Sequence, residues 1–169
     1  MKTLGQMVNQ YTSLLQGGEI QLAYKGILAF MGNLRSDFSS KCPDYEVGGS
    51  IYQGYMDMSY FSLNTPALKE HGLKIAVVYL HEKNAFQAWL SAQNRKILGK
   101  YRDIFNDVII DEVEVFHDEE NKDAVIECLV TDSPDFDNQG SLMETIEGGT
   151  VNFVNTIGKI LVTVSQFDS

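Results

Sequence analysis

The sequence predicts an α+β fold, with a mixed β-sheet of four to five strands packed by an N-terminal helix hairpin, a long central helix and a C-terminal helix. Three observations predict it: two helical stripes open the chain, strand-like runs occupy its middle, and another helical stripe closes it. At 169 residues the chain has the size of one ordinary domain. We therefore expect residues 1–169 to form a single domain.

Two amphipathic helices are expected at the start of the chain. The second carries apolar residues at helical spacing from Ile20 to Leu34, after a break at Gly17-Gly18. A break this short between two such helices predicts an antiparallel hairpin. The stripe of the first helix consists of Leu4, Met7, Val8, Tyr11, Leu14 and Leu15.

Short strands are expected over the next part of the chain. The segment from Glu46 to Leu63 is rich in aromatic and branched residues and is interrupted by glycine, which predicts strands at 46–52 and 55–63. Thr65-Pro66 then predicts the start of a single helical turn, ended by Gly72. The run LKIAVVYL at 73–80 is apolar on both faces, so it is predicted to be a central strand.

A long helix is expected directly after this central strand. Asn84 is its predicted N-cap, and the helical stripe runs through Phe86, Trp89 and Leu90 to Phe105. On that stripe Trp89 is predicted to belong to the core. Because a helix that joins two strands in one sheet forms a crossover, the pattern predicts one parallel, right-handed connection.

Two more strands and a closing helix complete the predicted order. The strands are expected at 108–115 and 124–130, separated by an acidic turn. Ser141 and Glu144 have the spacing of a capping box, which predicts the start of the C-terminal helix.

The charge of the chain disfavours several classes of partner. The net charge is −10, so the average surface repels the phosphates of nucleic acids and the headgroups of anionic lipids. No apolar run approaches the roughly 20 residues of a membrane span. Cys42 and Cys128 lack metal-ligand spacing, which favours free thiols in a reducing compartment. We expect a cytoplasmic protein that does not associate with a membrane and needs no cofactor or metal.

Candidate site residues gather around the end of the predicted central strand, where open α/β sheets tend to bind ligands. His81 at this end is suited to act as a general base, oriented by Asp57 or Glu82. Arg95 on the following helix is suited to clamp a carboxylate or phosphate. The predicted ligand-binding residues are Tyr55, Asp57, His81, Glu82, Gln93, Asn94 and Arg95.

Two known motifs are only partly matched. A calcium loop over residues 135–140 would need a glutamate at its twelfth position, where the chain has Ile146. The order of elements is also similar to a nuclease core that uses an Asp and an (Asp/Glu)-x-Lys pair. Glu82 and Lys83, however, follow each other directly, so such a fold would be degenerate.

The stretch YMDMSYFSLNTPALKEHGLKIAVVYLHEKNAFQAWLSAQNRKI, residues 55–97, resembles a family of uncharacterised bacterial proteins, a domain of unknown function. Its most specific element is the pattern Trp-Leu-x-x-x-Asn-Arg, which begins at Trp89. The resemblance implies a bacterial, cytosolic origin. It transfers no substrate and no catalytic residue.

The leading functional hypothesis is a non-catalytic module that binds a small molecule or regulates another protein, because no complete catalytic constellation is present. One alternative is a small hydrolase-like enzyme that uses His81 with Asp57 or Glu82. Further alternatives are the degenerate nuclease-like fold and an interaction protein that forms a homodimer through its N-terminal helix hairpin. Whether the chain is an enzyme stays open at this stage.

Overall fold

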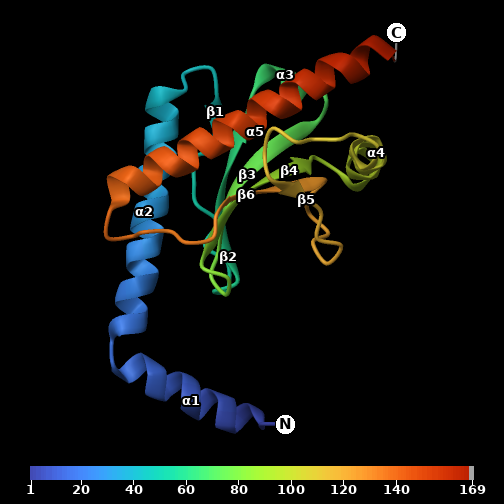
Figure 1. The fold of residues 1–169 in the computed structure, drawn as a ribbon. Coiled ribbons are helices and arrows are strands. Elements are labelled where there is room, and N and C mark those ends of the chain that lie inside the picture. Colours follow the sequence, from blue (N-terminus) through green and yellow to red (C-terminus); the bar gives the residue numbers. More distant parts are fainter. Residues whose placement is uncertain (168–169) are drawn as a thin grey trace.

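The computed structural model of the chain describes residues 1–167, so the last two residues of the predicted domain lie outside the described part (Figure 1). The described residues form an α+β fold of six strands and five helices. The helices are α1 Leu4–Gln16, α2 Glu19–Lys41, α3 Pro66–Glu70, α4 Arg95–Asn106 and α5 Gln139–Phe167. The strands are β1 Glu46–Val47, β2 Met58–Asn64, β3 Leu73–Leu80, β4 Ala85–Ala92, β5 Val115–Phe116 and β6 Ile126–Thr131.

The six strands form one sheet in the order β1-β2-β3-β4-β6-β5, and every neighbouring pair is antiparallel. The prediction of a mixed sheet with a parallel crossover is therefore wrong, as is the count of four to five strands. The two outermost strands contain only two residues each. Such short edges limit the unpaired backbone that the sheet offers to other chains.

The predicted long helix from Asn84 is wrong in its first half, where the chain forms β4. Residues 81–84 close a tight β3–β4 hairpin, and Asn84 adopts a φ of 48°, which asparagine tolerates better than most residues. Only α4 is helical, and Asn94 is its N-cap: the Asn94 side chain accepts a hydrogen bond from the backbone N–H of Ile97.

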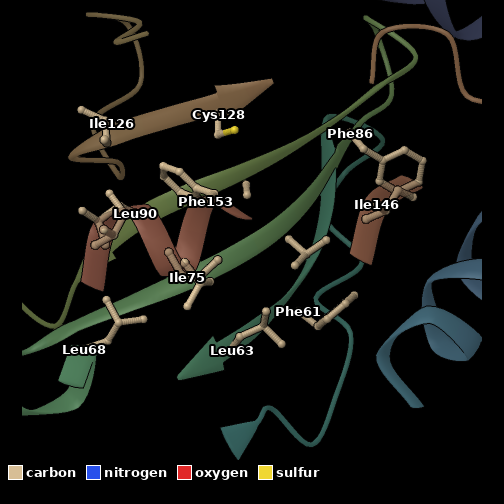
Figure 2. Close-up of a cluster of buried hydrophobic side chains, with 14 of the residues drawn as sticks. Phe61, Leu63, Leu68, Ile75, Phe86, Leu90, Ile126, Cys128, Ile146 and Phe153 are labelled. Carbon is tan, nitrogen blue, oxygen red and sulfur yellow. The ribbon is translucent and has the colours of Figure 1, made fainter. Parts of the chain in front are cut away.

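One face of the sheet is covered by helices, and the main core lies there. Apolar residues of α2 and α5 pack against alternate residues of the strands, including Phe61, Ile75 and Leu90. Figure 2 shows Phe153 and Ile146 of α5 directed at these strands. The final helix is confirmed, but it begins at Gln139, two residues before the predicted capping box.

The other face of the sheet carries no helix in its centre. Its small apolar cluster consists of Ala76, Val78, Trp89 and Ala124, with Met58, Tyr60 and Leu80 at its margin. Because side chains alternate along a strand, Phe86 and Leu90 of β4 face the helices while Trp89 faces this open side. Trp89 is therefore not part of the stripe on which the helical pattern placed it.

The N-terminal helices do not form the predicted hairpin on the sheet. The break at Gly17-Gly18 is confirmed, and Gly18 has a φ of 78°, a conformation that favours glycine. The second half of α2 packs on the sheet, whereas α1 points away from the body of the molecule (Figure 1). None of the residues of α1 is buried.

Several other elements are shorter or shifted relative to their predictions. The strand expected at 46–52 is reduced to β1 and one isolated bridge between Tyr52 and Tyr60. The strand expected at 108–115 is reduced to β5. The short helix after Thr65 and the strand at 73–80 are confirmed. No helix among residues 1–167 has the length and hydrophobicity that crossing a bilayer requires.

Candidate functional site

A trough runs along β4 on the open face of the sheet. It consists of three adjoining pockets with volumes of about 270, 230 and 190 Å³. The first and second share Met58 and Trp89 as lining residues. The second and third share Ser91, Ala92 and Asp123. We call these three pockets together the trough. It extends from the β3–β4 turn to the start of α4.

The floor of the trough is built from two neighbouring side chains of β4. Trp89 is only 8% exposed, and its indole N–H donates a hydrogen bond of 2.8 Å to the side-chain oxygen of Gln87. Gln87 is 6% exposed and lines the first pocket. Its amide nitrogen donates no hydrogen bond to any residue of the described part and is not one of the fully enclosed side-chain atoms that lack a partner, so it is open to solvent in the first pocket. The floor therefore combines an aromatic surface with an unused donor.

A buried carboxylate, Glu127 of β6, fixes one wall of the trough. Glu127 is 1% exposed and lies opposite Trp89 on the neighbouring strand. It accepts hydrogen bonds from the Asp118 backbone N–H and the Asn121 side chain, and its other oxygen is 3.1 Å from Nδ1 of His117. Burial raises the pKa of Glu127, and the contact with His117 opposes that rise. These contacts hold residues 117–121 beside the open face.

The first pocket of the trough is strongly acidic. Apart from Glu127, its lining includes four carboxylates, and its only basic lining residue is Lys83. In a concave site such like charges add to a negative potential that attracts cations. The four carboxylates are Asp57, Glu82, Asp118 and Glu120.

Asp57 has a structural role in addition to its place in the lining. Its Oδ1 accepts hydrogen bonds from the backbone N–H groups of Met58 and Tyr55, at 2.8 and 3.0 Å. These bonds lower the pKa of the Asp57 carboxyl, because they favour its charged form. Gly54 begins this turn with a φ of 72°, and a Cβ there would collide with the carbonyl oxygen of Met58. The turn thus holds Asp57 ionised at the mouth of the pocket.

His81 does not join the carboxylates of the trough. Its ring lies on the helix-covered side, with ring centroids 4.9 Å from Tyr79 and 5.6 Å from Tyr24. Nε2 of His81 is 2.9 Å from Oγ of Ser59, a residue with no exposed surface. The Ser59 hydroxyl donates its proton to the carbonyl of Gln53 at 2.7 Å, so His81 must be the donor in its bond with Ser59.

This arrangement is unlike that of a serine nucleophile and its base. A base would accept the hydroxyl proton, and the serine would be open to substrate. Here the proton is engaged elsewhere and the serine is enclosed. The His81–Ser59 pair instead links the β3–β4 turn to β2, and the bond from Ser59 to Gln53 extends this link to the segment before β2.

We expect His81 to make the stability of the protein fall in mildly acidic solution. Burial lowers the pKa of His81 below its ordinary value of 6.5, although Asp57 opposes this shift. The unfolded chain then binds the proton more readily, so stability is present above about pH 6.5 and is lost as the pH falls below it. In urea unfolding, the free energy of unfolding should fall further between pH 8 and pH 5 for the wild type than for His81→Gln.

A matched variant separates this effect from general acid sensitivity. His71→Gln removes a half-buried histidine whose ring contacts Ala67 and Ser165 and which lines none of the three pockets. In this variant the free energy of unfolding should fall between pH 8 and pH 5 by the same amount as in the wild type. If His81→Gln behaved in the same way as His71→Gln, the assigned role of His81 would be wrong.

The remaining predicted site residues lie at the two ends of the trough or outside it. Asp57 and Glu82 line its first pocket, whereas Gln93, Asn94 and Arg95 line its third pocket at the start of α4. Nη2 of Arg95 is 3.7 Å from Oδ1 of Asp123 and its Nη1 donates to the carbonyl of Lys122, so its guanidinium is engaged. Tyr55 is 92% exposed and lines none of the three pockets.

The centre of the site consists of residues that the sequence did not single out as ligand-binding. Gln87 and Glu127 were not among the candidates, and Trp89 was assigned to the core. Strand alternation supplies the missing signal: in AFQAWLSA the residues Gln87, Trp89 and Ser91 share one face. A row of amide, indole and hydroxyl on one side of a central strand is unusual for a packed face.

The donor sets of the described residues do not resemble a metal centre. Among residues 1–167, no three His, Cys, Asp or Glu side chains converge as ligands to one metal ion would. The carboxylates of the first pocket are spread around its rim and do not meet at one point. The arrangement therefore suits a ligand whose positive charge is spread over several atoms better than a single metal ion.

A pocket of about 340 Å³ lies between α4 and β5, but its arginine has a structural role. It is lined by Arg102, Phe105 and Phe116 among others. The guanidinium of Arg102 donates hydrogen bonds to the carbonyls of Ala124 and Asn121, at 2.7 and 2.9 Å. These bonds anchor the loop before β6 to α4, so the guanidinium of Arg102 is already in use.

Comparison with known proteins identifies the family of the chain. No curated protein and no solved structure matches the sequence. One family model, described as Domain of unknown function (DUF7000), matches residues 4–161. The match includes α1 and the whole sheet, and it reaches Leu161 of α5. The chain therefore belongs to the DUF7000 family.

Proposed function

We propose that the chain is a non-catalytic binding module whose ligand is an organic cation, an amine or a guanidinium, held in the trough over Trp89. The observation that carries this proposal is the floor of the trough. There a nearly buried indole lies beside the unused amide donor of Gln87, under a rim of carboxylates. Ligand pockets commonly combine an apolar surface with a few placed polar groups.

The charge and the aromatic surface both favour a cation. A cation over the face of a tryptophan is attracted by the ring, by about 0.5–2 kcal/mol depending on its desolvation. The carboxylates of Asp57, Glu82 and Glu120 would add attraction from the rim. An anion would meet repulsion from the same groups. The Gln87 donor favours a ligand that also carries a hydrogen-bond acceptor; protonated agmatine and spermidine carry none, so they test the charge and the aromatic contact alone.

The absence of catalysis is supported by the position of the one histidine nearest to the trough. His81 directs its ring to Tyr24 and Tyr79 and lines none of the three pockets, although the Asp57 carboxylate is close enough to influence its pKa. Its neighbour Ser59 is enclosed. A general base must lie within hydrogen-bond reach of the proton that it removes. A ligand in the trough would not reach His81.

The single tryptophan of the chain gives a direct test, because it forms the floor of the trough. Purified protein is titrated with agmatine and spermidine while tryptophan fluorescence is recorded. We expect a saturable change for both cations and none for citrate. The double variant Glu82→Gln/Glu120→Gln should bind at least about 10-fold more weakly, since two rim charges are removed.

The control is a double variant with the same loss of charge elsewhere. Glu70 and Glu144 are exposed and line none of the three pockets. Glu70→Gln/Glu144→Gln should change the affinity less than about two-fold, because only the overall charge is altered. Equal weakening by both double variants would show nonspecific attraction to an acidic protein. That result, or no saturable change, would refute the proposal.

A further inference from the structure

The N-terminal arm, residues 3–18, exposes an apolar surface that the described chain does not cover. Five large side chains of α1 lie along one stripe of this helix. The five are Leu4, Met7, Val8, Tyr11 and Leu14, with exposed fractions from 48% to 73%. Contiguous apolar surface of this kind marks an interaction site.

The helix α1 is too short to be stable without such a contact. Isolated helices of fewer than about 12–15 residues are marginal in water. α1 has 13 residues, and its capping box between Thr3 and Gln6 is its main local support. It contains no charged residue, so ion pairs four residues apart cannot stabilise it. Covering its apolar stripe would supply the missing stabilisation.

The charge of the arm indicates what covers it. Residues 3–18 contain no charged side chain, although the whole chain has a net charge of −10. A helix that lies on an anionic membrane normally carries Lys and Arg on its polar face. An acidic or basic protein groove would likewise find no charge to recognise. A second copy of α1 offers the same uncharged apolar stripe, and two α1 helices would meet without like-charge repulsion.

We propose that the arm is the interface of a symmetric homodimer, in which α1 of one chain packs on α1 of its partner. A twofold axis makes such an interface self-complementary. At about 100 Å² for each half-exposed large side chain, the five residues of α1 hold on the order of 500 Å². Each partner of a standard interface buries about 800 Å², of which a little over half is apolar, so the stripe matches the apolar share of such an interface.

The family match is consistent with a functional arm. It begins at Leu4, the first residue of α1, so α1 belongs to the domain and is not an appended segment. The interface is also independent of the trough, because no residue of the arm lines any of its three pockets. The dimer and the cation site can therefore be tested separately.

Sedimentation equilibrium of the full chain tests the dimer. At about 100 µM we expect a mass twice the 18.9 kDa of one chain. Met7→Glu/Tyr11→Glu places two charges in the stripe and should raise the dissociation constant at least about 100-fold. Both residues are exposed in the single chain, so the body should remain folded, as circular dichroism can verify.

The matched control places the same charges on the opposite side of α1. Asn9 and Ser13 lie away from the stripe on the helix, and Asn9→Glu/Ser13→Glu should remain dimeric. A monomeric wild type, or a dimer that survives Met7→Glu/Tyr11→Glu, would overturn the proposal. So would a monomer that binds vesicles of phosphatidylcholine and phosphatidylglycerol, since a membrane would then be the partner of the arm.

Discussion

Replacing Phe153 by alanine is expected to lower the free energy of unfolding by about 3–5 kcal/mol. Phe153 has no exposed surface and projects from α5 into the main core, with Ile75 and Leu90 in the same cluster (Figure 2). The variant loses the transfer free energy of the ring and leaves a cavity that the sheet cannot readily close. Urea unfolding followed by circular dichroism measures the loss.

Val162→Ala provides the comparison on the same helix. Val162 is 60% exposed, so its replacement should change the free energy of unfolding by less than about 0.5 kcal/mol. A loss below about 1 kcal/mol for Phe153→Ala would show that α5 is not held to the sheet as the structure describes.

Replacing Glu127 by alanine is expected to cost about 2–4 kcal/mol of stability, although burial disfavours its charge. The change leaves three groups without their acceptor: the Asp118 backbone N–H, the Asn121 amide and the His117 ring. Residues 117–121 would then be released from the open face. Water would reach Trp89, and its fluorescence should shift to longer wavelength.

Glu127→Gln is the matched control, because its side-chain oxygen can still accept from Asp118 and Asn121. We expect it to lose less than about half as much stability as Glu127→Ala and to keep the fluorescence maximum of the wild type. If Glu127→Ala had the same free energy of unfolding as the wild type, residues 117–121 would not depend on this carboxylate for their position.

Local signals in the sequence predicted two of the helix boundaries and the central strand. The break at Gly17-Gly18, the cap at Thr65 and the strand at 73–80 are confirmed. In each case the decisive interaction lies within a few residues, as when the Thr65 side chain accepts the Leu68 N–H. Such signals do not depend on the rest of the fold.

The segment after β3 was mispredicted because its apolar residues fit two periods. Phe86, Trp89 and Leu90 suit a helical stripe, whereas Phe86, Ala88 and Leu90 suit one face of a strand. Pairing with β3 decided the outcome, since residues 85–92 match β3 residue for residue. Antiparallel pairing through a tight turn stabilises this hairpin, and no local pattern reveals that partner.

Only part of the candidate site was placed by the sequence, because the rest depends on how the strands pair. Glu82 and Asp57 were correctly placed near each other, because both lie next to strand ends. His81 and Glu82 are adjacent in the β3–β4 turn, yet only Glu82 lines the first pocket, whereas the ring of His81 packs against Tyr79. Glu127 comes from a strand 40 residues later than Gln87, so only the completed sheet brings it to Trp89.

The most direct test of the central claim is the indole N–H resonance of Trp89 in ¹⁵N-labelled protein. The chain has one tryptophan, so one indole signal reports on the floor of the trough. During a titration with agmatine, that signal and the side-chain amide of Gln87 should shift and saturate together, while the amides of α1 stay in place. An unmoved indole signal, with shifts scattered over exposed carboxylates, would contradict a cation site over Trp89.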